Sequence, residues 1–277
     1  MATTSPAAPP RRRSPLRIVL VVLACLVGLV LLAVLALVAW VQLRPLSAGD
    51  YRLANNEVGY VGEEVDFAGQ AVATSFNDLA SGDRAVVEAS AQRVRDQVGL
   101  AADGAQQLGE LRAMEDPEVA RQVAAVQEGV AAMETYLRAY ADAMLPIAQM
   151  NATCAAWAED PATSVDSGSS AAEVNAAAQP CVQQATAVEQ AGEGAWTQLG
   201  SAQLAFVADT AAALELVEQR PEDFEAHYAA ENQAREDHQT AVQQANAALG
   251  EELGQVGDRV TEPLNALGSY TEQRAAG

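Results

Sequence analysis

The chain has 277 residues with no lysine, 16 arginines and 37 acidic residues, and its formal net charge is −21. Half of the residues are hydrophobic but only 5% are aromatic, a composition that favours helices and argues against a β-sandwich. The negative charge also argues against a nucleic acid as partner, because phosphate binding requires a basic surface.

Charge divides the chain into two parts. Residues 1–49 contain five arginines and no acid, whereas residues 50–277 contain the other eleven arginines and all 37 acids, a net charge of −26. So abrupt a change is typical of a polypeptide that occupies two environments. Residues 1–16 are rich in Pro, Ala, Ser and Thr, which predicts a disordered tail.

An uncharged apolar segment covers residues 18–41 and consists almost entirely of Leu, Val and Ala. At ~1.5 Å per residue it reaches ~36 Å, enough to cross a ~30 Å hydrocarbon core. Four arginines precede the segment within a few residues. The positive-inside rule therefore predicts a transmembrane helix over 17–44, embedded in the cell membrane with the N-terminus cytoplasmic and the C-terminal domain extracytoplasmic.

Three other N-terminal signals compete with this interpretation. A cleavable signal peptide has an apolar core of only ~7–15 residues. A lipoprotein would use Cys25, but the apolar run continues for 16 residues beyond it. A twin-arginine signal would use Arg12 and Arg13, yet the run is too hydrophobic for one. An uncleaved single-pass anchor is favoured, and the lack of lysine with much Ala, Val, Arg and Gly is typical of a high-GC bacterium such as an actinobacterium.

The clearest helical pattern lies in residues 119–147, where apolar residues alternate at spacings of four and three. They are Val119, Val123, Val126, Val130, Met133, Leu137, Tyr140, Met144 and Ile147. This seam predicts an amphipathic helix that packs along its whole length. Similar seams before and after it predict an all-α domain over 50–277 with four long helices, at about 58–113, 117–158, 171–219 and 221–272.

Helix start signals support these boundaries. Asp116, Pro117 and Glu118 form an N-cap, a proline in the first turn and an adjacent acid, and residues 221–223 repeat the pattern. Ser170 and Glu173 fit a capping box. Pro263 is expected to kink or end the last helix.

Short connections between the helices predict an elongated antiparallel bundle with up-down-up-down topology. In this plan the first helix leaves the membrane and the second returns. The connections at 113–117 and 219–222 would then lie at the far tip, and the polar loop 159–170 and the C-terminus would lie near the bilayer.

Cys154 and Cys181 are the only cysteines outside the apolar segment. They lie on the seams, near the end of the second predicted helix and the start of the third. Those two ends meet in an antiparallel hairpin, and an extracytoplasmic location is oxidising, so a structural disulfide is expected. Two free core thiols or a redox pair are the alternatives, although no C-x-x-C spacing supports redox chemistry.

His227 and His238 are the only histidines and share a helix face, with Glu231 one turn after His227. Imidazole and carboxylate are good metal ligands, so these three are weak candidates for a metal site. Two histidines on an acidic helix are more often simply solvated. No nucleophile elbow, P-loop, dinucleotide-binding turn or His-Glu-x-x-His motif is present, so neither an enzyme nor a cofactor is expected.

These features predict a membrane-anchored interaction protein or scaffold of a bacterial envelope complex, with other membrane or envelope proteins as partners. Trp157, Trp196 and Tyr228 are the candidate interface residues, because large aromatics dominate interface energies, although each of them equally fits a widened core. Alanine-rich seams suit self-association as well as internal packing.

The alternative is a ligand-sensing module that works through a partner. The expected plan is similar to the four-helix extracytoplasmic sensor domains of bacterial chemoreceptors and histidine kinases, but those have a second membrane helix, and no second run of that kind follows here. A metal-binding bundle or an enzyme ranks third.

Overall fold

The structure, a computed structural model, describes residues 30–32, 34, 44–165 and 168–277. It divides the chain into two units, residues 1–46 and 47–277. The predicted tail (1–16) lies outside the described residues, as does the transmembrane segment (17–44) apart from residues 30–32, 34 and 44. Within the described ranges, no helix has both the length and the apolar character needed to cross a bilayer.

Every regular element in the described part of residues 47–277 is helical, which confirms the all-α prediction. The α-helices are α2 (Ala48–Ser81), α3 (Arg84–Leu108), α4 (Pro117–Ala158), α5 (Ala171–Glu189), α6 (Thr197–Gln219) and α7 (Phe224–Ala276). Two short 3-10 helices, η1 (Arg112–Glu115) and η2 (Pro161–Thr163), lie on either side of α4.

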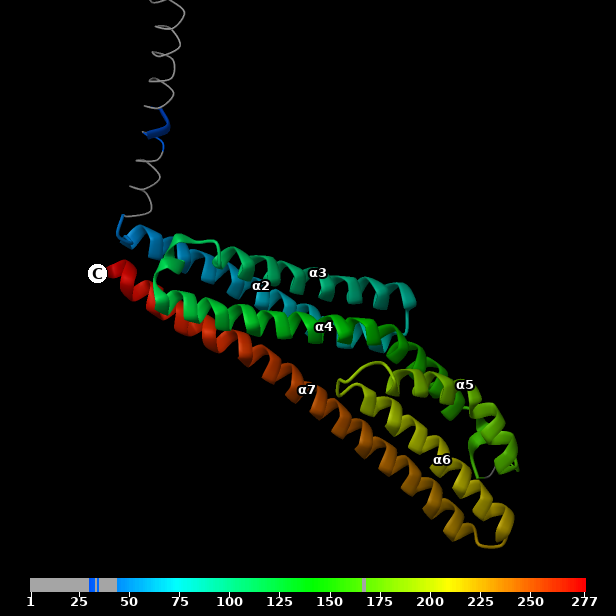
Figure 1. Ribbon diagram of the computed structural model, residues 1–277. Helices are drawn as coiled ribbons and strands as arrows, with labels where there is room; N and C mark the ends of the chain where they lie inside the picture. Colours follow the sequence, from blue (N-terminus) through cyan, green and yellow to red (C-terminus); the bar gives the residue numbers. More distant parts are fainter. Residues whose placement is uncertain (1–29, 33, 35–43, 166–167) are drawn as a thin grey trace, which may run out of the picture. The chain divides into compact units, whose positions relative to one another are not determined.

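The two longest helices, α4 and α7, pack against each other, and the other four α-helices pack on this pair (Figure 1). With 42 and 53 residues they are ~63 and ~80 Å long. α4 covers the predicted range, and all nine residues of its predicted seam are buried. α7 continues through Pro263 to Ala276, so this proline does not end the helix. The hairpin α2–α3 packs on one half of the α4–α7 pair and the hairpin α5–α6 on the other half.

The predicted helix 58–113 is wrong, because the structure divides it into α2 and α3. Gly82 adopts a left-handed conformation with φ of 66°, which glycine tolerates and which ends α2. Asp83 then caps α3 by accepting hydrogen bonds from the backbone N–H groups of Ala85 and Val86. The stop and start signals are adjacent, so the chain reverses direction within three residues.

The predicted helix 171–219 is also divided, into α5 and α6. Gly192, with φ of 98°, lies in the connection. The connection is tied to the long helices through Glu252 of α7, whose Oε2 accepts hydrogen bonds from Ala195 N at 2.8 Å and from the Tyr136 hydroxyl of α4 at 2.7 Å. The structure therefore contains two helical hairpins where two continuous helices were expected.

The hairpins also reverse the predicted placement of the loops. Residues 113–117 lie beside the start of α2 and the end of α7, because the Asp116 carboxylate contacts both Tyr51 and Tyr270. The loop after α4 lies at the opposite end, where Val165 N donates to Glu231 near the start of α7. The sequence predicts that residues 113–117 form a tip remote from the C-terminus and that loop 159–170 lies at the same end as the C-terminus. Both expectations are wrong.

The backbones of α4 and α7 meet closely at Gly129. A Cβ atom at this position would lie 2.4 Å from the carbonyl oxygen of Arg259. That distance is far shorter than any real contact, and the obstructing atoms are backbone. Only glycine therefore allows the two long helices to pack at this separation.

We expect Gly129→Ala to lower the free energy of unfolding by about 2 kcal/mol or more, because the added methyl group forces the backbones of α4 and α7 apart. Gly254→Ala is the matched control, since a Cβ atom there meets nothing within 4 Å. The control should raise stability by up to about 1 kcal/mol through helix propensity. Urea denaturation followed by circular dichroism measures both, and equal effects would contradict the close-packing argument.

Candidate functional site

A row of large exposed side chains runs along α2. Leu53, Tyr60 and Phe67 follow one another at intervals of seven residues and are 61%, 39% and 48% exposed. Residues seven apart lie on the same side of a helix, so the three side chains form one stripe. The core of α2 is filled by other residues, among them Val58, Val61 and Val65, and the three side chains of the stripe keep large exposed fractions.

α3 extends the stripe sideways. Gly104 of α3 lies against Tyr60, because a Cβ atom on Gly104 would be 3.2 Å from the ring Cε1 atom. Leu100 lies one helical turn from Gly104 and is 41% exposed. The apolar stripe therefore covers neighbouring parts of α2 and α3.

Carboxylates lie among these apolar side chains. The charge of Glu64 raises the pKa of the Tyr60 phenol above its ordinary value, and burial, the hydrogen bond to Glu64 and the charges of Glu57 and Asp103 add to the effect. Glu64 is only 9% exposed. One carboxylate oxygen of Glu57 and one of Glu64 are buried and accept no hydrogen bond within the part of the chain that the structure describes.

Buried carboxylate oxygens without a donor are costly, since they lose hydration and gain nothing in return. The charge of these carboxylates would attract an arriving cation. We name Leu53, Glu57, Tyr60, Glu64, Phe67 and Leu100 the acidic–apolar face. Its chemistry suits a ligand that offers apolar groups and positive charge together.

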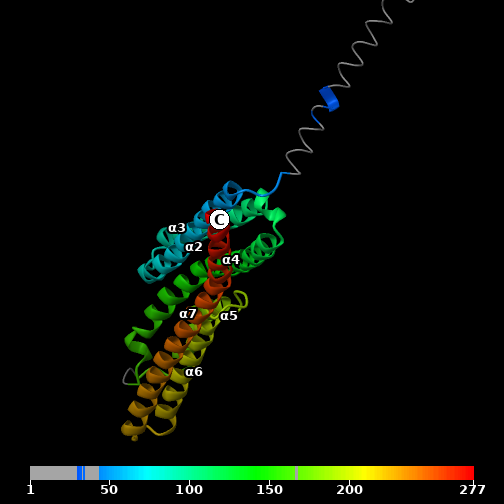
Figure 2. The same ribbon diagram turned by 90° about the vertical axis from the view of Figure 1, so that its left-hand side faces the viewer.

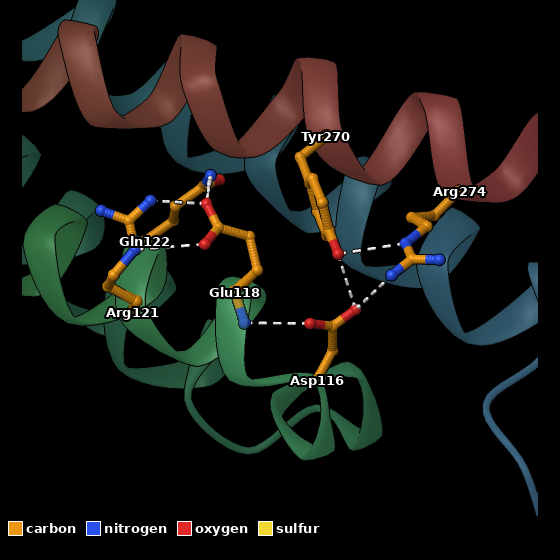
Figure 3. Close-up of polar contacts among 6 residues, drawn as sticks. All are labelled: Asp116, Glu118, Arg121, Gln122, Tyr270 and Arg274. Carbon is orange, nitrogen blue, oxygen red and sulfur yellow. Dashed lines mark hydrogen bonds and ion pairs between the residues drawn. The ribbon is translucent and has the colours of Figure 1, made fainter.

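A second polar cluster gathers around Asp116, the N-cap of α4 (Figure 3). Its Oδ2 atom accepts hydrogen bonds from the hydroxyls of Tyr51, at 2.8 Å, and Tyr270, at 2.9 Å, and lies 3.6 Å from Arg274. Its Oδ1 atom accepts from the backbone N–H of Glu118. The cluster joins the start of α2, the start of α4 and the end of α7.

The Asp116 cluster is closed on itself. Burial favours the neutral form of Asp116, but the hydrogen bonds from Tyr51, Glu118 and Tyr270, with the charge of Arg274, outweigh it and lower the pKa. Burial and the hydrogen bond to Asp116 raise the pKa of Tyr51 to about 12. The hydroxyls of Tyr51 and Tyr270 and the backbone N–H of Glu118 donate to this carboxylate, and Arg274 Nε donates to the Tyr270 hydroxyl at 3.0 Å. The cluster therefore stabilises the fold and holds no group free for acid–base chemistry.

Cys154 and Cys181 form the expected disulfide, with their Cα atoms 4.7 Å apart. Both residues are buried. The bond joins α4 to α5 and fixes the second hairpin to the long helices. Because the pair is covalently bonded within the core, it serves structure.

The histidines lie at different places on α7. His227 is 2% exposed and its Nε2 atom is 2.8 Å from the carbonyl oxygen of Arg220. His238 stacks on Phe206 with ring centroids 4.5 Å apart. Glu231 is paired with Arg235 at 2.9 Å. Among the described residues, no group of three or more His, Cys, Asp or Glu side chains is placed to hold a metal ion.

Two of the three candidate interface aromatics lie in the core. Trp157 is 6% exposed and Trp196 is 1% exposed. The indole N–H of Trp196 donates to the carbonyl oxygen of Ala191, and its ring contacts Tyr136 and Tyr140. These two tryptophans widen the core, so their proposed interface role is wrong. Tyr228 is 45% exposed.

The acidic–apolar face was missed because the predicted first helix began at residue 58 and only its buried seam was traced. The signal is present in the sequence as Leu53, Tyr60 and Phe67, a second heptad row beside the first. Comparison of the chain with known protein families, curated proteins and solved structures finds no match.

We expect Asp116→Ala to reduce the free energy of unfolding by about 2–4 kcal/mol, because it removes a helix cap and buried hydrogen bonds to a charge. Asp83→Ala, which removes only the exposed cap of α3, should cost about 1 kcal/mol.

The Asp116 contribution should also depend on pH. Since the folded pKa is lowered below the ordinary 3.8, the stabilisation is fully present above that value and is lost as the pH falls through the folded pKa. Thermal unfolding from pH 7 to pH 2 should show the two curves of wild type and Asp116→Ala converging in acid. A constant difference down to pH 2 would contradict this account.

Reduction of the disulfide should lower the free energy of unfolding by about 3–4 kcal/mol in the chain-entropy model, given the 27-residue separation. The Cys154→Ala, Cys181→Ala double variant should show the same loss and no further response to reductant. Thermal scans with and without reductant measure it, and an unchanged midpoint for reduced wild type would contradict a stabilising role.

Proposed function

We propose that this protein is a single-pass membrane protein of a bacterial envelope that serves as an accessory subunit or scaffold. Residues 18–41 anchor it in the bilayer, and residues 47–277 form its extracytoplasmic helical domain. The acidic–apolar face binds a basic amphipathic helix of a larger membrane complex. The observation that carries this proposal is the pair of buried, unpartnered carboxylate oxygens of Glu57 and Glu64 beside exposed Tyr60.

The shape of the face supports a helix as the partner. Leu53 and Phe67 are 14 residues apart, so the stripe is ~21 Å long, equal to about four helical turns. A helix lying along it would present apolar residues to the stripe at three- and four-residue spacings. A row of large exposed apolar side chains on one side of a helix is typical of an interaction site.

Charge selects the partner. Residues 50–277 carry a net charge of −26, so a second copy of the domain or an anionic lipid surface would be repelled. Arginine or lysine on the flanks of an apolar helix face would reach Glu57 and Glu64, and such charge-assisted hydrogen bonds are strong when shielded from water. A basic helix therefore fits better than a copy of this chain or a bilayer.

The test is a titration of the full-length protein, in a neutral detergent, with a fluorescent helical peptide that has leucine on one face and arginine on its flanks. Wild type should bind it, and the Tyr60→Ser, Phe67→Ser double variant should bind at least about tenfold more weakly. Phe224→Ser is the matched control, since Phe224 is 64% exposed on α7. It should bind as wild type does.

Glu64→Gln separates a recognition role from a structural one. It removes the buried charge while preserving size, so peptide binding should weaken by about tenfold or more. The thermal midpoint should change little, because the amide keeps the size of the side chain and its oxygen can still accept the Tyr60 hydrogen bond. Equal binding by all variants would show non-specific attraction to an acidic protein and overturn the proposal. The proposal would also be overturned if the wild-type protein formed a dimer and the Tyr60→Ser, Phe67→Ser variant were a monomer, because the face would then bind a second copy of the chain.

A further inference from the structure

A cleft of about 790 Å³ lies where the end of α2 meets α4, α6 and α7. Its lining extends along α4 from Tyr140 to Ala158 and along α7 from Arg235 to Leu249. At ~1.5 Å per residue these stretches are ~27 and ~21 Å long, so the cleft is elongated. It lies away from the acidic–apolar face and requires a separate explanation.

Most of the wall is apolar. It is formed by Phe76 and Leu79 of α2, Ile147 and Met150 of α4, Phe206 of α6 and Leu249 of α7. Elongated apolar clefts with a few polar groups are the usual form of small-molecule sites. The wall therefore favours a hydrocarbon chain over a compact polar ligand.

One largely buried polar side chain in this wall has no hydrogen-bond partner among the described residues. Gln203 of α6 lines the cleft and is only 9% exposed. None of the hydrogen bonds among the described residues involves its amide, and the amide atoms are not among the fully buried ones, so they can be reached from the cleft. An amide offers both donors and an acceptor, so it matches a hydroxyl or ester group.

The charged groups at the cleft do not favour an anion. Arg235 is already paired with Glu231 at 2.9 Å. Burial lowers the pKa of His238, so its imidazole is neutral at pH 7. The surrounding domain carries a large negative charge, which disfavours a carboxylate or phosphate further.

We propose that this cleft binds an uncharged lipid with a single hydrocarbon chain, whose hydroxyl or ester group hydrogen bonds to Gln203. One acyl chain fills half of a ~30 Å bilayer core, so it needs ~15 Å and fits the cleft with room for a small head group. The inference rests on the cleft alone and does not depend on the helix partner proposed above.

Two tryptophans report on the cleft. The ring of Trp157 contacts Phe206 with centroids 5.8 Å apart, and the ring of Trp196 contacts Tyr140 with centroids 6.0 Å apart. Both contacted residues line the cleft. Occupation of the cleft should therefore change tryptophan fluorescence.

The experiment titrates full-length protein, held in a non-ionic amphipathic polymer, with monolauroylglycerol or with laurate. Fluorescence and calorimetry should show saturable one-to-one binding of monolauroylglycerol and at least about tenfold weaker binding of laurate. Gln203→Leu should weaken monolauroylglycerol binding by about fivefold, the effect of one net hydrogen bond.

Steric variants locate the site. Ala155→Trp, on the cleft wall, should reduce affinity by at least about tenfold, whereas Ala156→Trp, exposed on α4 beside it, should not. Asn246→Trp blocks the cleft from α7 and should repeat the Ala155→Trp result if that variant folds poorly. Absence of saturable binding, tighter binding of laurate, or equal binding by the steric variants and Ala156→Trp would overturn the proposal.

Discussion

The close approach of α4 and α7 at Gly129 is the constraint on which the rest of the domain depends. These are the two longest helices in the described residues, and each hairpin packs on a different part of the pair. Alanine and glycine at the contacts allow the backbones to come near each other, and the apolar area buried per residue is then modest. The separation of the two long helices sets the spacing of everything that packs on them.

Each half of the domain has its own means of fastening. The α2–α3 half is joined to α4 and α7 by hydrogen bonds to the ionised Asp116 carboxylate. The α5–α6 half is joined by the Cys154–Cys181 disulfide and by Glu252. One fastening responds to acid and the other to reductant, so the two halves differ in the conditions that loosen them. The acidic–apolar face lies on the first half and the cleft lies where the halves meet.

Much of the architecture could be predicted from periodicity and capping residues. The boundaries of α4 follow from Asp116, Pro117 and an uninterrupted seam, and the disulfide follows from two cysteines at facing helix ends. The break at Gly82 was missed although the apolar pattern shifts its frame there, and the break at Gly192 was missed because Val188 and Ala195 keep a seven-residue spacing across it. A left-handed glycine ends a helix through backbone geometry, which a hydrophobic pattern does not record.

The functional surfaces were harder to predict for a different reason. Large aromatics are typical of interfaces, but in this domain Trp157 and Trp196 are buried in a core that consists mostly of small side chains, where their volume fills the space between helices. Tyr60 and Glu64 stand out only when the neighbouring helix is known, because Gly104 of α3 brings a second set of side chains beside them. Likewise, the isolation of the Gln203 amide depends on which partners the fold places near it.

The meeting of the start of α2 with the end of α7 has a mechanical consequence. Tension applied between these two ends would pull directly on the contacts among Tyr51, Asp116 and Tyr270, which lie across the line of force. The contacts at that end would be loaded and broken one after another. Breaking contacts in sequence requires less force than sliding two packed helices past each other, which loads many contacts at once. The α5–α6 hairpin would bear no tension until the contacts along the first half of the long helices had separated. The domain therefore unfolds first at one end while the other end stays folded.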